Sequence, residues 1–313
     1  MVLSVATFVG MFIMMVAATL LLRHRGVLGE SSKPLLSTIL MDVVSPAVIF
    51  SSLASSHPSV QHLHAAGVVF GAEFINAGIA FLIARYILRL HRSAMGVFII
   101  ASTFGSTALI GTAMVQVLFH NDPEITSMGL IIGQFGVGIP VNTLGILLAI
   151  HFGSRDSQVP ISQHLKQTLR TPFMLALYAG IGWSFFGLPT SGSGLETLFG
   201  ACRMIGASQP FCTAMVIGLS LEKFDFRSDL ATIVAVAVVC LAIEPLLVSS
   251  ITHVMTIDMQ TRVVANLFAA MPTSPLVVVF ALKYGGDVVL ASKLSMATLL
   301  LSTATLPLFA LIA

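Results

Sequence analysis

An apolar run over residues 263–282 contains two prolines, and this combination limits what the chain can fold into more than any other feature. The run is long enough to cross a bilayer as a helix, which takes roughly 20 residues. Pro272 and Pro275 each lack an N–H and clash with the carbonyl group four residues earlier, so a continuous helix is unfavourable. In hydrocarbon, irregular backbone is tolerated only where it lines a cavity or is buried in protein. The run therefore predicts a broken, functional membrane helix; the alternative is a proline-kinked helix that binds nothing.

The composition as a whole predicts an all-α polytopic membrane protein. The chain is 56% hydrophobic and only 9% charged, with a mean hydropathy of +0.98, whereas soluble proteins have about 25% charged residues. A net charge of +2 does not favour nucleic acid as a partner. The hydrophobic composition makes the lipid bilayer the expected surroundings of the chain. Ten apolar stretches are predicted to span it, at about 3–22, 35–54, 65–88, 94–119, 126–150, 171–186, 195–221, 230–254, 263–282 and 288–312.

The basic residues of the loops predict the orientation. One set of alternate loops contains thirteen Lys and Arg residues, while the other set contains only Arg262; Arg203 falls inside a span and is not counted. Loops rich in Lys and Arg face the cytoplasm. We therefore predict a multi-pass protein of the cell membrane, with both termini on the extracytoplasmic side and the long polar stretch 151–170 as a cytoplasmic loop.

The spans divide into two halves, 1–150 and 171–313, on either side of that loop. Five spans are an odd number, so a duplicated half must insert upside down relative to the first. The halves share landmarks, because Pro46 and Pro210 occupy the second span of each half and weak helix occurs in the fourth span of each. Paired interrupted segments at corresponding positions point to a transport site between inverted repeats.

Several short motifs spread over the chain resemble the auxin efflux carrier family, which includes plant PIN-type carriers and bacterial organic-acid permeases. They are Gly26-Val-Leu-Gly, Ser45-Pro-Ala-Val-Ile-Phe-Ser-Ser-Leu53, Pro210 with Ile217-Gly218, Ala269-Ala-Met-Pro-Thr273 and Tyr284-Gly-Gly-Asp287. The resemblance implies ten helices in two inverted five-helix repeats, with broken helices four and nine crossing. It also implies a scaffold of helices 1, 2, 6 and 7, through which a homodimer can form, and a mobile transport unit of helices 3–5 and 8–10. The short loop 151–170 is similar to that of the bacterial members.

Helix four departs from the family pattern. The family commonly has Asn-x-Gly-x-x-Gly-x-Pro there, where this chain reads Ser106-Thr-Ala-Leu-Ile-Gly-Thr-Ala113. The asparagine and the proline are both missing. This chain therefore departs from the family at residues that bear on the identity of the substrate and on how sharply helix four is interrupted.

The substrate site is expected where the two broken helices meet. The half-helix after Pro275 begins with unpaired N–H groups that carry roughly half a positive charge, and a weaker end of the same kind is expected near Gly111. Such ends can hold an anion without a lysine or arginine in the hydrocarbon. Asn142 supplies both a donor and an acceptor, and it matches a position that the family uses in binding. The predicted substrate-binding residues are Ser106, Thr107, Asn142, Met271, Pro272, Thr273, Ser274 and Pro275.

Ionisable groups inside the spans are expensive and mark partners or pathways. Glu73 and Asn76 lie one turn apart on one face of the third span and are the predicted ion-coupling residues. In the family that the chain resembles, an acidic residue in helix three supports the crossing. A protonated glutamate in a structural hydrogen bond is the alternative for Glu73. Glu244 and Arg203 are expected toward the outer side in structural roles, paired with each other or with Arg203 reaching the interface.

These features predict a secondary transporter that moves a small organic anion by alternating access of the elevator type. A mono- or dicarboxylate such as malonate or malate is what the resemblance implies. A non-transporting membrane sensor or assembly protein with the same fold is the alternative. No enzyme motif and no ATP-binding loop is present in the sequence, so neither catalysis nor a cofactor or metal is expected. Coupling to H⁺, coupling to Na⁺ and uncoupled transport all stay open.

Overall fold

The computed structural model describes residues 2–29, 31–55, 59–111, 114–115, 119, 123–153, 169–192, 194–220, 229–255 and 257–312. Within these residues every regular element is helical, and a single isolated β-bridge joins two loops. The α-helices are α1 (Val2–His24), α2 (Ser32–Ile39), α3 (Ser45–Ala54), α4 (Val60–Leu82), α5 (Arg92–Thr103), α7 (Pro123–Gly133), α8 (Ile146–Phe152), α10 (Pro172–Phe185), α11 (Leu195–Ala207), α12 (Gln209–Ser220), α13 (Leu230–Val238), α14 (Glu244–Val254), α15 (Met259–Ala269), α16 (Leu276–Tyr284) and α17 (Val288–Ile312).

Six π-helical turns interrupt or extend these helices: η1 (Leu40–Val44), η2 (Ile83–Ile87), η3 (Thr107–Gly111), η4 (Gln134–Gly138), η5 (Val141–Gly145) and η6 (Val239–Ile243). Four of them lie beside a proline. η1 ends just before Ser45-Pro46, η4 and η5 flank Pro140, and η6 ends just before Glu244-Pro245. A proline has no N–H to give to the preceding turn, and a wider turn accommodates the freed carbonyl group. The prolines therefore widen these three spans without ending them.

Five helical segments of the described chain are long and apolar enough to cross a membrane. They are Ser32–Ala54, Val60–Ile87, Met128–Phe152, Leu230–Val254 and Val288–Leu306. Ile13–His24 and Pro172–Phe185 are shorter apolar helices. The predicted seventh span divides into α11 and α12 at Ser208, and the predicted fourth and ninth spans are broken. The chain is thus an all-α, multi-pass membrane protein, while the count of ten spans in inverted repeats stays a prediction.

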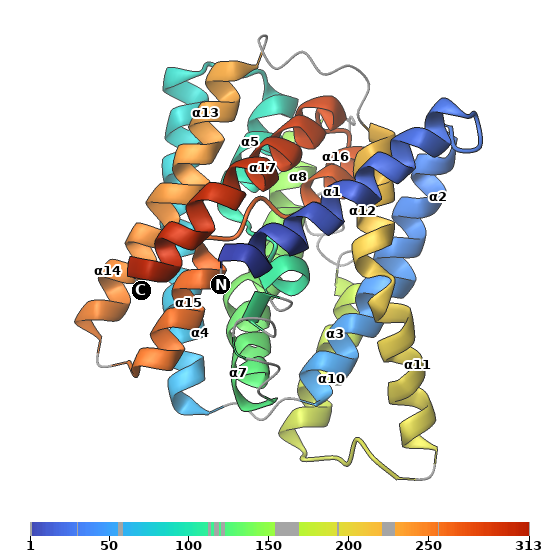
Figure 1. Ribbon diagram of the computed structural model, residues 1–313, viewed down its shortest axis with the longest axis vertical. Coiled ribbons are helices and arrows are strands. Elements are labelled where there is room, and N and C mark those ends of the chain that lie inside the picture. The colour runs from blue at the N-terminus through green and yellow to red at the C-terminus, as the bar shows by residue number, and fades with distance from the viewer. Residues whose placement is uncertain are drawn as a thin grey trace.

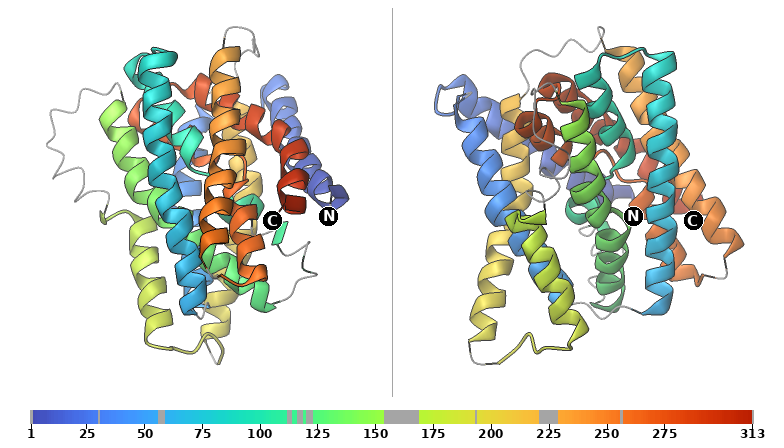
Figure 2. Two further views of the ribbon diagram at one scale, coloured as in Figure 1. Left: turned by 90° about the vertical axis from the view of Figure 1, so that its left-hand side faces the viewer. Right: turned by 180° about the vertical axis from the view of Figure 1, so that it is seen from behind.

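The helices pack in two groups (Figures 1 and 2). In one group α3 packs against α10 and α11, and α12 packs against α1 and α2. In the other, α4 packs against α5, α7, η4, α14 and α15. α1 and α12 also pack against α17, and α12 packs against α16, so the division into a scaffold and a transport unit stays a prediction. Much of the predicted loop, residues 154–168, lies outside the described residues, as do 221–228 and parts of the fourth span.

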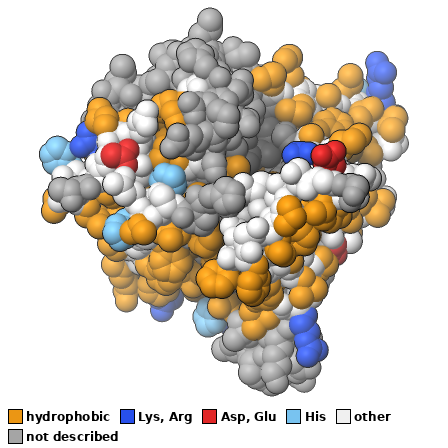
Figure 3. Space-filling view, turned by 90° about the horizontal axis from the view of Figure 1, so that it is seen from below, with side chains coloured by type: hydrophobic (Ala, Val, Ile, Leu, Met, Phe, Trp, Pro, Cys, Tyr) orange, Lys and Arg blue, Asp and Glu red, His pale blue; other side chains and the backbone are white. Residues whose placement is uncertain are grey.

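Connecting loops alternate between two ends of the molecule. The helix ends that join α1 to α2, α4 to α5 and α16 to α17 lie at the upper end of Figure 1. The end of α3, the start of α4, and the helix ends that join α10 to α11 and α14 to α15 lie at the lower end. On the face seen from below, hydrophobic side chains are common and charged ones are scattered among them (Figure 3). Phe185 is 82% exposed and Val254 is 85% exposed, as expected of side chains that face lipid.

Candidate functional site

Two breaks in the helices meet inside the second group. α5 ends at Thr103, and Phe104 is extended with φ −101° and ψ 110°. α15 ends at Ala269, and α16 begins at Leu276. Between these ends, Gly105 and Thr273 form an antiparallel bridge. We call residues 104–106 and 270–275 the crossover.

The crossover is held by backbone hydrogen bonds from one break to the other. The N–H of Ser106 donates to the carbonyl of Pro272 at 2.8 Å, and the N–H of Ser274 donates to the carbonyl of Phe104 at 2.8 Å. In a membrane protein each unpaired backbone group costs several kcal/mol. Helix four is therefore sharply interrupted although it lacks the asparagine and proline of the family motif, because the break in helix nine supplies the partners that its own helix cannot.

Side chains satisfy other backbone groups near the breaks. Thr273 donates its hydroxyl to the carbonyl of Ala101 at 2.7 Å, and its N–H donates to the hydroxyl of Thr298 at 3.3 Å. Cys240 donates its thiol to the carbonyl of Met271 at 3.4 Å. The carbonyl groups freed at the two breaks, those of Ala101, Phe104, Met271 and Pro272, therefore all have partners within the crossing.

A close fit of one aromatic ring also fixes helix nine on helix four. Phe268, at the end of α15, is 1% exposed. Its ring lies against Gly111, Gly129 and Gly133, and a Cβ added at Gly111 would lie 2.3 Å from a ring carbon. Only glycine at position 111 leaves room for this ring without a shift of the packing.

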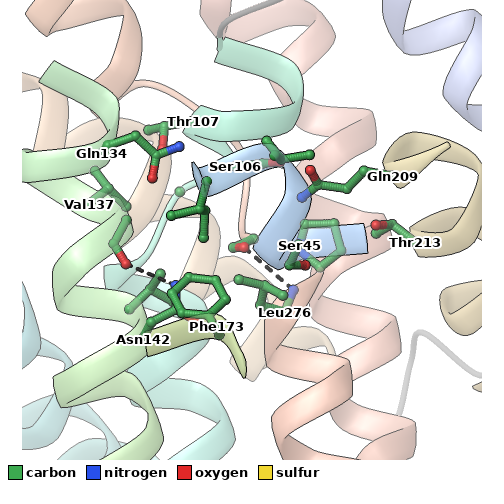
Figure 4. Close-up of a pocket in the computed structure, with 17 residues that line it drawn as sticks. Ser45, Ser106, Thr107, Gln134, Val137, Asn142, Phe173, Gln209, Thr213 and Leu276 are labelled. Carbon is green, nitrogen blue, oxygen red and sulfur yellow. Dashed lines mark hydrogen bonds between the residues drawn. The ribbon is translucent and has the colours of Figure 1, made fainter. Parts of the chain in front are cut away.

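A cavity opens where the crossover faces the first group of helices. Its volume of about 50 Å³ is room for a few water molecules. Figure 4 shows Gln134, Val137 and Asn142 on one side of this space and Ser45, Gln209 and Thr213 on the other. The cavity therefore lies between the two helix groups. Its lining residues are Ser45, Val48, Ile49, Gly105, Ser106, Thr107, Gln134, Val137, Gly138, Val141, Asn142, Phe173, Gln209, Thr213, Ser274, Pro275 and Leu276.

Three polar atoms of the lining are buried and have no hydrogen-bond partner. They are the hydroxyl oxygens of Ser45 and Ser106 and the Oδ1 atom of Asn142. The Nδ2 atom of Asn142 donates to the carbonyl of Gly138 at 2.9 Å, which fixes the direction of its amide group. Buried polar groups are nearly always hydrogen-bonded. A polar ligand in the cavity would give these three atoms partners.

The structure brings five of the eight predicted substrate-binding residues to the cavity: Ser106, Thr107, Asn142, Ser274 and Pro275. The other three, Met271, Pro272 and Thr273, lie in the crossover and are not among its lining residues. Ser274 also caps the following half-helix, since its hydroxyl accepts the N–H of Leu276 at 3.4 Å. Thr112, part of the polar stretch singled out in helix four, lies outside the described residues.

Four polar lining residues were missed from the sequence, namely Ser45, Gln134, Gln209 and Thr213. Ser45-Pro46 and Gln209-Pro210 are the equivalent landmarks of the second and seventh spans. Treating each landmark as a contributor to the site, and not only as a sign of duplication, would have found Ser45 and Gln209. No signal in the sequence separates Gln134 or Thr213 from ordinary polar residues within a span.

The predicted ion-coupling residues lie on α4, which packs against α5 and α14. Glu73 and Asn76 are both 0% exposed, and Asn76 donates Nδ2 to the carbonyl of Ser102 at 2.7 Å. The same nitrogen donates to Oε2 of Glu244 at 2.9 Å. Glu244 is therefore a buried neighbour of Asn76 and not an outer residue paired with Arg203, which is exposed on α11.

The cavity is lined by both polar and apolar side chains, and none of them is charged. None of its lining residues is Lys, Arg, His, Asp or Glu, so charge on a ligand would be met only by hydroxyl and amide dipoles and by helix ends. Across the described residues, no group of three or more His, Cys, Asp or Glu side chains is placed to hold a metal ion. Binding and orientation of a small polar ligand is what this arrangement can do.

A multi-pass helical protein with a polar cavity beside broken, crossing helices has the features of the secondary transporters as a class. Comparison with known proteins also points to membrane transport. The family described as membrane transport protein matches residues 3–171, so the chain belongs to that family, which confirms the resemblance to auxin efflux carriers. An uncharacterized transporter of Methanothermobacter thermautotrophicus is 26% identical over 294 residues, covering 93% of each chain. One of Methanocaldococcus jannaschii is 21% identical over 272 residues, covering 86% of this chain and 85% of the relative.

Proposed function

We propose that this protein is a secondary transporter that moves a small organic carboxylate across the cell membrane by alternating access. The observation that carries the proposal is the cavity between the two helix groups, with three buried polar atoms that lack partners. A transport site must be reachable from each side in turn, and a cavity between two packed groups opens when one group moves relative to the other. Neither a sensor nor an assembly protein requires such a polar cavity inside the membrane.

The crossover supports a carboxylate over a cation. α16 begins at the cavity wall, and its first residue, Leu276, lines the cavity. The N–H groups of Leu276, Val277 and Val278 already have partners in the protein, contrary to the expectation of unpaired donors. In the proposed site the positive end of the helix dipole therefore attracts a carboxylate, without the cost of placing Lys or Arg in hydrocarbon. The hydroxyl of Ser106 donates to a carboxylate oxygen, and the hydroxyl of Ser45 does so from the opposite wall. A protonated amine would meet the unfavourable end of the same dipole.

In the elevator-type movement that we propose, the crossover travels with helices 3–5 and 8–10 past a scaffold of helices 1, 2, 6 and 7. The cavity wall formed by Ser45, Gln209 and Thr213 then belongs to the scaffold, and the wall formed by Gln134 and Asn142 moves. In a homodimer that forms through the scaffold helices, the scaffold would stay fixed while the transport unit moves.

Uptake into proteoliposomes tests the function. The purified protein is reconstituted with internal malonate, and exchange for external labelled malonate is measured in the presence of other carboxylates, their amides and organic amines. We expect carboxylates to compete and amides to compete at least about tenfold less well, because loss of a charge-assisted hydrogen bond costs roughly 1.5–3 kcal/mol. Ser106→Ala is expected to weaken competition for the same reason.

Thr303→Ala is the matched control, because Thr303 donates its hydroxyl to Leu300 within α17 and does not line the cavity. Equal competition by an acid and its amide would refute the proposed recognition of a carboxylate. If no acid in the panel exchanged, the transport function would be refuted, and a sensor or assembly function would be favoured instead.

A further inference from the structure

The two buried glutamates are not used by the proposed substrate site, and they have an arrangement of their own. Glu73 on α4 is 0% exposed and Glu244 on α14 is 1% exposed. Asn76, which follows Glu73 by one turn on α4, donates to Oε2 of Glu244 at 2.9 Å, so both glutamates neighbour the same amide side chain. They come from the third span of each predicted half.

Asn76 stands between this pair and the crossover. Its Nδ2 atom donates both to Oε2 of Glu244 and to the carbonyl of Ser102, the last but one residue of α5. Its Oδ1 atom is buried and has no partner, and so are both carboxyl oxygens of Glu73 one turn earlier on the same helix face. An amide oxygen needs a donor, and a carboxylate has none to give. A protonated Glu73 would carry an O–H donor on the same face of α4, one turn before Asn76.

No positive side chain faces the pair within the described part of the chain. Of the ionisable groups on the packed elements, Cys240 of η6 is buried, and its thiol donates to the carbonyl of Met271. The others lie at helix ends: His62 and His64 on α4, Arg85 and Tyr86 on η2, Arg92 on α5, His253 on α14, and Asp258 and Arg262 on α15. The side chain of Glu124 on α7 lies outside the described residues. Two carboxylates buried without a counter-charge are strongly unfavourable, and a bound proton relieves the repulsion.

We propose that Glu73 and Glu244 form the proton site of the transporter and that one proton is carried with each substrate anion. A carboxylate oxygen of Glu73 takes up H⁺, and the new O–H donates to Oδ1 of Asn76, whose Nδ2 donates to the Glu244 carboxylate. On release this O–H bond breaks and the proton returns to water on the other side of the membrane. The inference rests on the proposed transport function and names its driving ion.

The crossover connects this site to the substrate. Asn76 bonds to Ser102, four residues before Ser106 in the cavity wall, while Thr273 holds Ala101. A carboxylate substrate at the cavity and a doubly charged glutamate pair behind the crossover repel one another. Binding of the anion therefore favours the protonated pair, and by linkage protonation favours binding of the anion. This reciprocal effect couples transport of the proton to transport of the substrate anion.

Proteoliposomes with a pH gradient test the proposal, with labelled malonate as the probe. For one proton per anion, an inward gradient of one pH unit raises malonate accumulation by up to about tenfold, since one unit of pH is a factor of ten in proton activity. We expect Glu73→Gln and Glu244→Gln each to abolish this stimulation while keeping exchange of internal for external malonate. Glu196→Gln, at an exposed acid on α11, is the matched control and should keep the stimulation. Glu73→Asp should restore part of the gradient response.

The outcomes separate the two proposals. Absence of exchange in the wild-type protein for malonate and for every other acid of the panel refutes the transport function itself. Exchange with a pH-gradient response that survives both glutamine substitutions overturns the proton site alone. If the glutamine variants do not fold, infrared spectroscopy of the wild-type protein decides. The carbonyl absorption of a protonated, buried carboxyl group must weaken as the pH is raised through the range in which uptake falls, and an unchanging band overturns the proposal.

Discussion

At the scale of single residues, the crossover depends on side chains that replace missing backbone partners. Thr273 is 2% exposed, and its hydroxyl donates to the carbonyl of Ala101 at 2.7 Å. Valine has the same shape and no donor, so Thr273→Val leaves a buried carbonyl unpaired. We expect a loss of about 1–3 kcal/mol in stability, the usual cost of an unsatisfied buried polar group. The thermal unfolding midpoint in detergent measures it.

Thr303→Val supplies the comparison, because the hydroxyl of Thr303 bonds to the carbonyl of Leu300 in its own helix on the exposed side. Substitutions away from buried networks usually change stability by less than about 0.5 kcal/mol. Equal unfolding midpoints for the two variants would show that the Thr273 hydroxyl does not hold the crossover.

The sequence predicted single residues with uneven success. Ser106, Asn142 and Ser274 were found because broken helices and membrane-embedded amides are unusual, and all three line the cavity. The role of Thr273 was missed, since its acceptor, Ala101, lies 172 positions away in the chain. For the same reason Glu244 was placed with Arg203 instead of with Asn76: burial inside a span is readable from one sequence, whereas the identity of the neighbouring helix is not.

At the scale of elements, the sequence predicted the break in helix nine but not how it is held. Its prolines forbid a continuous helix. Helix four has no proline at its break, and it ends where Phe104 and Ser106 pair with residues of helix nine. A tertiary contact thus overrides a local preference, which sequence patterns cannot show.

The fit between these two elements makes a prediction at Gly111. A methyl group there would lie 2.3 Å from the ring of Phe268, whereas a Cβ at Gly71 on α4 would meet nothing within 4 Å. Gly111→Ala is expected to lower stability by about 1–3 kcal/mol through overpacking, and exchange of substrate should fall with it. Gly71→Ala should leave both unchanged. A Gly111→Ala protein as stable as the Gly71→Ala protein would contradict the proposed packing of helix nine on helix four.

At the scale of the whole molecule, alternate loops gather at opposite ends, as a chain that crosses a membrane repeatedly requires (Figure 1). Which end faces the cytoplasm depends on the distribution of charge and not on the fold. The α1–α2 loop contains Arg25 and is flanked by Arg23 and Lys33. The α10–α11 loop from Gly187 to Gly194 contains no basic residue. Basic loops stay in the cytoplasm.

Labelling with a membrane-impermeant maleimide tests this orientation. With Cys202, Cys212 and Cys240 replaced by alanine, a single cysteine is introduced at Ser31 or at Ser191, both of which are exposed in loops. In intact cells we expect Ser191→Cys to react and Ser31→Cys to react only after the membrane is opened or inverted. Reaction of Ser31→Cys from outside would reverse the assigned orientation. It would also reverse the direction in which a proton gradient must point to load the site, because the fold is unchanged when the whole molecule is inserted the other way up.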